Sequence, residues 1–322
     1  MVTTSSRIRG SLYGVAIVDA LGGPVEFRQR GSFPPVTKFR YNSNFGLDPG
    51  TWTDDTSMTL CLAQSLVEKE GRFDALDQVK KYVKWWDAGY MSATGSCFDI
   101  GNATRRALGT WEKCIKDGDA GEKRVESYQD AINKYLGHEM SCGNGSLMRS
   151  CQIYTYLITN ILSNQGIDKT DLWDSFKRFE FAIKHKDGST AIPSALCDLF
   201  SKYPTLASFQ QKREDEIKSS GYVVHTLEAA LWVFWTTETF KEGALKVVNL
   251  GDDADTVGSV YGGMAGAWYG IESIPEEWID GLQAKKMVDE VVDGVVKLTE
   301  EGGYGDDSSR NDLLFTLADS PV

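Results

Sequence analysis

Apolar residues recur at helical spacing along almost the whole chain. In residues 57–70, for example, Met58, Leu62 and Leu66 follow one another at steps of four, and Gly71 ends the pattern. The alternation of apolar and polar residues that is typical of half-buried strands is hard to find. The pattern therefore predicts an all-α protein, a compact bundle of many helices with short connections.

The predicted helices fill most of the sequence. They cover residues 11–20, 57–70, 75–87, 99–113, 122–136, 145–163, 171–184, 191–202, 223–237, 239–249, 256–269 and 276–299. Between Arg28 and Thr53, repeated glycine, proline and asparagine exclude a regular helix. A loop of that length in a compact domain is commonly functional.

The sequence predicts a single domain. Nothing resembles an interdomain linker, so we expect one domain over residues 1–322, with its core at about 8–300. Residues 301–322 are acidic and poor in pattern, which predicts a mobile or loosely docked tail. No internal repeat is found.

The charge balance is strongly acidic. Lys and Arg number 34 against 46 Asp and Glu, which gives a formal net charge of −12 and excludes most proteins that bind nucleic acids through charge. No stretch is apolar enough for a membrane helix, and the start, MVTTSSRIRG, lacks the apolar core of a secretory signal. We therefore expect a cytoplasmic monomer, with the nucleus as the alternative compartment, and no membrane or nucleic-acid partner.

The cysteines and histidines give no indication of a zinc site. The six cysteines include no C-x-x-C pair, and the three histidines lie far apart in the sequence. We expect reduced core thiols. Any metal in this protein must be bound by oxygen ligands.

Two acidic clusters each precede a predicted helix. The first is the run TDDT at residues 53–56. The second, GDDADT at residues 251–256, leads into glycines at every fourth position from Gly258 to Gly270, which leave one helix face bare for the close approach of another backbone. Two interpretations are open: the acids cap their helices, or they bind a hard divalent cation that relieves their mutual repulsion.

Two further features are candidates for ligand contacts. The run SCGNGS at residues 141–146 places glycines before a predicted helix, where backbone N–H groups suit a phosphate or diphosphate. An ordinary glycine-rich turn would look the same. Asp99 is the only acid among the small and apolar residues of 90–108, and it is either a helix cap or a carboxylate that faces a ligand.

Taken in order, these segments resemble the ADP-ribosylglycohydrolase family, and most closely its dinitrogenase reductase-activating branch. The resemblance rests on GVAIVDALGGPVEF (14–27), GTWTDDTSMTLCLAQSL (50–66), WWDAGYMSATGSCFDIGNATRRAL (85–108), CGNGSLMR (142–149), GYVVHTLEAALWVF (221–234) and NLGDDADTVGSVYGGMAGAWYG (249–270). It implies an all-α fold with a metal-binding cleft for two divalent cations, Mg²⁺ or Mn²⁺. It also implies a hydrolase that removes ADP-ribose from modified protein side chains.

The resemblance further implies roles for particular residues. The implied metal ligands are Thr53, Asp54, Asp55, Asp253, Asp255 and Thr256. The implied catalytic carboxylates are Glu26, Asp55 and Asp253. The implied substrate contacts are Ser141, Gly143, Asn144 and Gly145 for the diphosphate, His185 elsewhere on the ligand, and Asp99 near a guanidinium.

Three functions are compatible with the resemblance. We favour hydrolysis of ADP-ribosyl-arginine, on a protein or a small ADP-ribose conjugate, because a carboxylate at Asp99 pairs well with a guanidinium. The alternatives are hydrolysis of ADP-ribosyl-serine or O-acetyl-ADP-ribose, and a catalytically silent ADP-ribose-binding relative. The six ligand positions argue against the silent relative, since carboxylates that repel one another have no use there. The chain departs from the usual family pattern at Val18, at Asp252 in place of a glycine, and at Lys184-His185.

Overall fold

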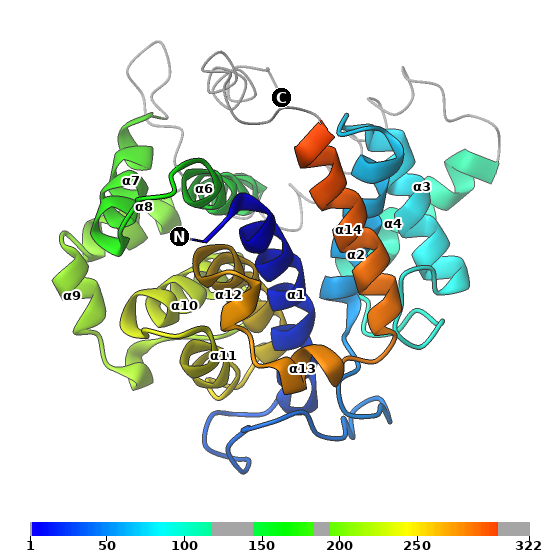
Figure 1. Ribbon diagram of the computed structural model, residues 1–322. Helices are drawn as coiled ribbons and strands as arrows, with labels where there is room; N and C mark the ends of the chain where they lie inside the picture. The colour runs from blue at the N-terminus through cyan, green and yellow to red at the C-terminus, as the bar shows by residue number, and fades with distance from the viewer. Residues whose placement is uncertain (1, 117–143, 183–193, 302–322) are drawn as a thin grey trace.

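The computed structural model describes residues 2–116, 144–182 and 194–301. They form helices joined by short connections and one long loop (Figure 1). Within these ranges there is no β-strand, only two isolated bridges, Arg28 with Asp252 and Asn42 with Leu47. The expectation of an all-α fold is confirmed.

The helices carry the labels of Figure 1. They are α1 (Thr4–Gly22), α2 (Asp54–Glu68), α3 (Ala75–Ala88), α4 (Asn102–Lys116), α6 (Asn144–Ser163), α7 (Lys169–Ala182), α8 (Ser194–Lys202), α9 (Leu206–Gln210), α10 (Val223–Thr236), α11 (Phe240–Val248), α12 (Ala254–Tyr269), α13 (Glu276–Asp280) and α14 (Lys285–Glu301). Three short 3₁₀ helices accompany them: η1 (Gly23–Val25), η2 (Glu214–Glu216) and η3 (Ile271–Ser273).

Two predicted helix boundaries were wrong for local reasons. α1 starts well before residue 11, because the Thr3 side chain accepts a hydrogen bond from the Ser6 amide at 3.1 Å and caps the helix. The helix predicted over 276–299 is two helices, since Ala284 has a φ of 45° and Gln283 donates its amide to the Gly50 carbonyl at 2.9 Å. The predicted helix at 122–136 and the tail at 302–322 lie outside the described residues.

The expectation of core thiols holds for only part of the described chain. Cys61 is buried on α2, but Cys151 on α6 is exposed, so that cysteine is a surface residue rather than a core one. None of the described helices is both long enough and apolar enough to cross a membrane.

Helix α1 runs through the middle of the molecule, with α12 and α10 on one side and α14 and α2 on the other (Figure 1). Its apolar residues Ile17 and Leu21 are fully buried. A second part of the core gathers aromatic rings from α7, α9 and α10, where Trp173 meets Trp235 edge-on at 5.2 Å between ring centroids. Because α1 is covered on several sides, its C-terminal end is held firmly in place.

Helices α1 and α12 are antiparallel and pack with their backbones in close contact. A Cβ added to Gly14 or to Gly262 would overlap the carbonyl oxygen of the other residue, and the same relation links Gly10 with Gly266. The glycines therefore act in pairs, one from each helix, and they let the two axes approach more closely than side chains would allow.

Every fourth residue of α1 from Gly10 to Gly22 faces α12, and Val18 is the one of these four that is not glycine. It is fully buried. Its Cγ1 lies 3.0 Å from where a Cβ of Gly258 would be, and its Cγ2 lies at the same distance from that of Gly262. The two methyl groups thus fill the space that the glycines of α12 leave, and the departure from the family pattern at Val18 keeps the close packing intact.

We predict that Gly262→Ala destabilises the protein by at least about 1–3 kcal/mol, because the added methyl group overpacks a backbone contact. The matched control is Gly166→Ala, where nothing lies within 4 Å of the added Cβ, and its stability should change by less than about 1 kcal/mol. Urea unfolding followed by circular dichroism measures both. Equal effects of the two substitutions would mean that the contact between α1 and α12 is not tight.

Candidate metal and active site

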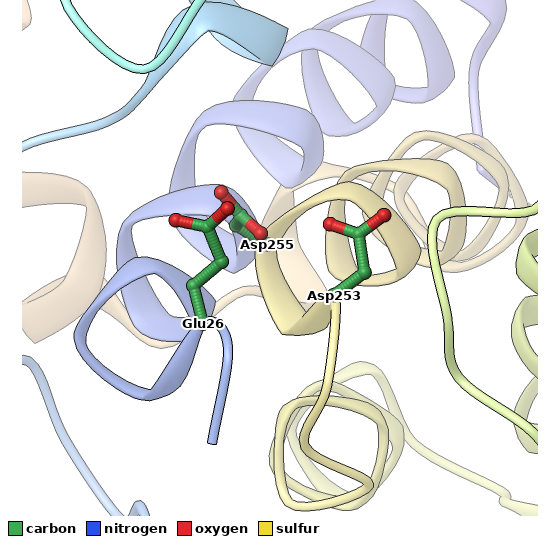
Figure 2. A group of neighbouring side chains, drawn as sticks. All are labelled: Glu26, Asp253 and Asp255. Carbon is green, nitrogen blue, oxygen red and sulfur yellow. The ribbon is translucent and has the colours of Figure 1, made fainter. Parts of the chain in front are cut away.

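Three carboxylates from the two ends of the chain meet where α1 ends and α12 begins. Glu26 follows η1, which extends α1, and Asp253 and Asp255 lie at the start of α12. One oxygen from each of the three lies within 4.8 Å of the others. Figure 2 shows the side chains of Glu26 and Asp255 next to each other, with that of Asp253 on the facing side.

The contact between α1 and α12 positions these residues. A Cβ on Gly22 would lie 2.5 Å from the Ala254 carbonyl oxygen, so the end of α1 touches the start of α12. Just beyond, Phe27 donates its amide to the Asp252 carbonyl at 2.7 Å, and the Asp252 amide donates to the Arg28 carbonyl at 2.8 Å. The segments on either side of the carboxylates are therefore tied together by backbone hydrogen bonds.

Asp19 connects the third segment, the start of α2, to this group. Its carboxylate accepts hydrogen bonds from the amide and hydroxyl of Thr53, both at 2.9 Å, and from the amide and hydroxyl of Thr56, at 3.0 and 2.5 Å. The Thr53 hydroxyl also lies 3.3 Å from Asp255 Oδ2. Asp19 thus holds Thr53, Asp54 and Asp55 against the carboxylates of Glu26 and Asp255.

The N-cap residues of the two helices do not cap them through their side chains. Thr53 is the N-cap residue of α2 and Asp253 that of α12, yet neither side chain makes the capping hydrogen bond. At α2 the amides at the helix start bond instead to Asp19, which belongs to another helix. The acids of the two clusters are therefore available to bind something else.

Burial raises the pKa values of these carboxyl groups. It raises the pKa of Asp54 to about 8, with help from the nearby Asp99 and Asp19. It raises the pKa values of Asp55 and Asp255 well above the ordinary range, with further repulsion from neighbouring acids. The pKa of Asp19 rises only to about 6, because the hydrogen bonds from Thr56 and Thr53 offset burial.

Asp99 lies beside Glu26 and not at a helix start. It precedes α4 by three residues and has a φ of 59°, a conformation that a residue other than glycine adopts only at a cost in free energy. Burial, followed by the charge and hydrogen bond of Asp99, raises the pKa of Glu26 to about 10, and burial raises that of Asp99 to about 6. The two carboxyl groups share a hydrogen bond, so the strained loop brings Asp99 to the site.

Asp252 faces solvent beside the site. It is exposed, and its φ of 55° lies in the region that favours glycine, as does the φ of 73° at Gly251. Asp252 raises the pKa of Asp253 slightly through its charge, after the larger effect of burial. The departure from glycine therefore adds an exposed acid and some backbone strain, and it leaves the buried carboxylates in place.

The structure brings together the acids that the sequence indicated, and adds residues that it did not. Glu26, Asp54, Asp55, Asp99, Asp253 and Asp255 converge, with Thr53 and Thr256 among them. Asp19 was not predicted as a site residue, although an acid within the apolar run 16–21 was a signal for it. Gly221 was also missed: a Cβ there would lie 2.8 Å from Asp253 Oδ2.

Three of the predicted ligand contacts, Ser141, Gly143 and His185, lie outside the described residues. Asn144 and Gly145 form the first turn of α6, so a helix does follow the glycine-rich run as predicted. Their assignment to a diphosphate stays a prediction.

The chemistry of the acidic group fits a divalent cation. Among the described residues no Lys or Arg forms an ion pair with these acids, and four buried carboxylate oxygens have no hydrogen-bond partner: Glu26 Oε2, Asp55 Oδ2, Asp99 Oδ2 and Asp255 Oδ1. A site with several unpaired acceptor oxygens and no cationic side chain beside them suits a hard cation. Burying such oxygens unpaired is otherwise costly.

These features define a helical protein with a largely buried group of carboxylates that could hold a metal ion. Comparison with known proteins gives the family: the sequence matches the ADP-ribosylglycohydrolase family over residues 1–151 and 150–305. The chain belongs to this family, whose members are hydrolases of ADP-ribose linkages. The fold, the family and the enzyme class expected from the sequence are confirmed.

Individual relatives cover nearly the full chain. The ADP-ribosylarginine hydrolase Tri1 of Serratia proteamaculans is 32% identical over 92% of this chain and 81% of its own length. The ADP-ribosyl-[dinitrogen reductase] glycohydrolase of Rhodospirillum rubrum is 28% identical over 87% of this chain and 91% of its own. A solved ADP-ribosylglycohydrolase-related protein complex matches with a TM-score of 0.65 and 28% identity, over 92% of this chain and 99% of that one.

We predict that the metal-free protein loses stability as pH rises. The folded-state pKa values of Asp19, about 6, and Asp54, about 8, lie above the ordinary 3.8, so the folded state binds more protons than the unfolded chain in this range. This stabilising contribution is complete below about pH 4 and is lost as pH rises through about 8. Melting temperatures in EDTA across this range measure the loss.

Excess Mg²⁺ or Mn²⁺ should raise the melting temperature most at the alkaline end, because a cation that binds the carboxylates replaces their protons. A pH dependence that is identical with EDTA and with either cation would contradict a metal site.

Proposed function

We propose that this protein is a divalent-metal-dependent hydrolase that releases ADP-ribose from ADP-ribosylated arginine side chains. The observation that carries the proposal is the convergence of six acids from four segments, with buried oxygens left unpaired. The names of the relatives support the linkage, since Tri1 is an ADP-ribosylarginine hydrolase. The substrate is then an ADP-ribosylated protein or a small ADP-ribose conjugate.

The reaction breaks the bond between C1″ of the distal ribose and a guanidine nitrogen. Water supplies the hydroxyl group at C1″, and its proton goes to the leaving guanidine. The transition state carries positive charge on the ribose ring. The carboxylates around Glu26 and Asp255 favour such a charge.

Two divalent cations, Mg²⁺ or Mn²⁺, would be held by Thr53, Asp54, Asp55, Asp253, Asp255 and Thr256. When bound, such cations orient ribose hydroxyls and lower the pKa of a coordinated water. The Thr256 side chain lowers the pKa values of both Asp55 and Asp253 against the effect of burial, so it lies close to both acids. It therefore links the two acidic clusters across the site.

Asp99 and Glu26 form the part of the site that we assign to the guanidinium. The pair carries one shared hydrogen bond, and Asp99 Oδ2 is buried with no partner. A substrate guanidinium placed there would donate charge-assisted hydrogen bonds to Asp99 and relieve its repulsion from Asp253. Glu26, with the higher pKa of the two, would hold the proton that the pair shares.

The test of the function is release of ADP-ribose from an arginine-linked conjugate with Mg²⁺, Mn²⁺ or EDTA. Asp55→Asn should lower kcat by more than about 100-fold, since groups that only support metal ligands are worth 10–100-fold. The matched control is Asp87→Asn on α3, an exposed acid outside the acidic group, which should keep full activity. Turnover in EDTA equal to that with metal would overturn the proposal.

The linkage is tested with Asp99→Asn, which keeps the shape of the side chain and removes its charge. Activity on arginine-linked ADP-ribose should fall about tenfold to a hundredfold more than activity on serine-linked or O-acetyl-linked ADP-ribose, because only the guanidinium forms a charged pair, worth about 1.5–3 kcal/mol. Relative kcat/KM values on the three substrates measure this. An equal loss on all three would place Asp99 in the shared catalytic machinery, and no loss would favour another linkage.

A further inference from the structure

The loop that follows Glu26 is basic, unlike the rest of the chain. It carries Arg28, Arg30, Lys38 and Arg40 and no acid before Asp48, in a protein whose formal net charge is −12. In Figure 1 this loop extends from the end of α1 that bears the acidic group. A positive segment thus borders a strongly negative site.

The side chain of Arg30 is used in hydrogen bonds within the fold. Its Nε donates to the Leu250 carbonyl at 3.0 Å, and its Nη2 donates to the Ile217 carbonyl at 2.7 Å. These bonds fasten the loop to the connections that precede α12 and α10. Arg30 is therefore a structural residue with few donors left for a ligand.

Arg28 and Arg40 are different, because both guanidinium groups lie against the same ring. Each has its Cζ 5.8 Å from the centroid of Phe33. Among the described residues no carboxylate lies within 4.0 Å of either, and Arg28 makes no side-chain hydrogen bond there. Arg40 donates to the Pro34 carbonyl at 3.0 Å, but its Nη2 is buried with no partner.

The positive charges of Arg28 and Arg40 repel each other, and within the described ranges no acid lies beside them to offset this repulsion. The two arginines have no acidic partner among the described residues, although the chain has 46 acidic residues. The Phe33 ring that both guanidinium groups approach offsets part of the cost through cation–π contact. An anion from outside the chain would complete the arrangement, since guanidinium groups bind carboxylates through two parallel hydrogen bonds.

Arg28 lies at the edge of the acidic group. It lies two residues after Glu26, and its carbonyl accepts from the Asp252 amide at 2.8 Å, so its backbone is fixed to the edge of the acidic group. Phe27, between them, has a φ of 62° and is 73% exposed. Exposed aromatic and arginine side chains are the residues that most often anchor protein partners.

We propose that Arg28 and Arg40 dock acidic side chains of the protein that carries the modified arginine. This rests on the proposed function. Elsewhere, the net negative charge of the enzyme repels an acidic protein. An attractive pair of cations at the rim would therefore select substrates with acids near the modified residue and turn that residue toward the site.

The test compares three substrates of the metal-loaded enzyme: free ADP-ribosyl-arginine, and ADP-ribosylated peptides with acidic or with neutral flanks. Arg28→Glu should raise KM for the acidic peptide about three- to tenfold at low salt, with kcat unchanged. The effect should shrink as salt is added, because Arg28 is exposed. Activity on the free conjugate and on the neutral peptide should stay at the wild-type level.

Two further variants complete the design. Arg28→Gln removes the charge without adding one and should give a smaller rise in KM for the acidic peptide. Lys80→Glu makes the same charge change as Arg28→Glu at an exposed position of α3 and should leave all three substrates unaffected.

Two results would overturn the docking proposal. An equal loss on the free conjugate would mean that the arginines bind the phosphates of ADP-ribose, and an unchanged KM for the acidic peptide would mean that they dock nothing. Absence of turnover on the free conjugate by the wild-type enzyme would instead refute the proposed function.

Discussion

The close packing of α1 against α12 is the contact on which the rest of the structure depends. Glycines from both helices remove the side chains that would hold the two backbones apart. Because the helices are antiparallel, the end of α1 then lies at the start of α12, and the residues just beyond each helix end meet. Glu26, Asp253 and Asp255 come together for this reason, and the backbone bridge between Arg28 and Asp252 continues the same contact into the loop.

The buried acidic group lowers the stability of the fold, and a bound ligand that pairs with its oxygens would restore it. Four of its oxygens are buried without a hydrogen-bond partner, and the charges of neighbouring carboxylates raise the pKa values of Asp54 and Asp255 beyond the effect of burial. Only Asp19 is fully supplied with hydrogen bonds, and it uses them to orient the start of α2. One acid of the site, Asp19, therefore positions other residues, as the groups that orient metal ligands do, and the remaining acids could bind a ligand.

The sequence was informative where a pattern is local. Helical periodicity gave the all-α class, and the runs TDDT and GDDADT marked two of the acidic segments. It was less informative where a contact joins distant residues. The role of Asp19 depends on amides of another helix, and the break at Ala284 depends on a hydrogen bond from Gln283 to Gly50. Asp99 was expected at a helix start, but a positive φ places it beside Glu26 instead.

The pairing of α1 with α12 also determines when the chain can complete its fold during synthesis. α1 is synthesised well before α12, because the described helices from α2 to α11 lie between them in the sequence. At roughly 5–20 residues per second, α1 waits on the order of ten seconds or more with Ile17 and Leu21, buried in the finished fold, still uncovered. A chain interrupted before α12 therefore has neither a covered first helix nor a complete set of acids. Binding of a cation would then distinguish finished molecules from unfinished ones.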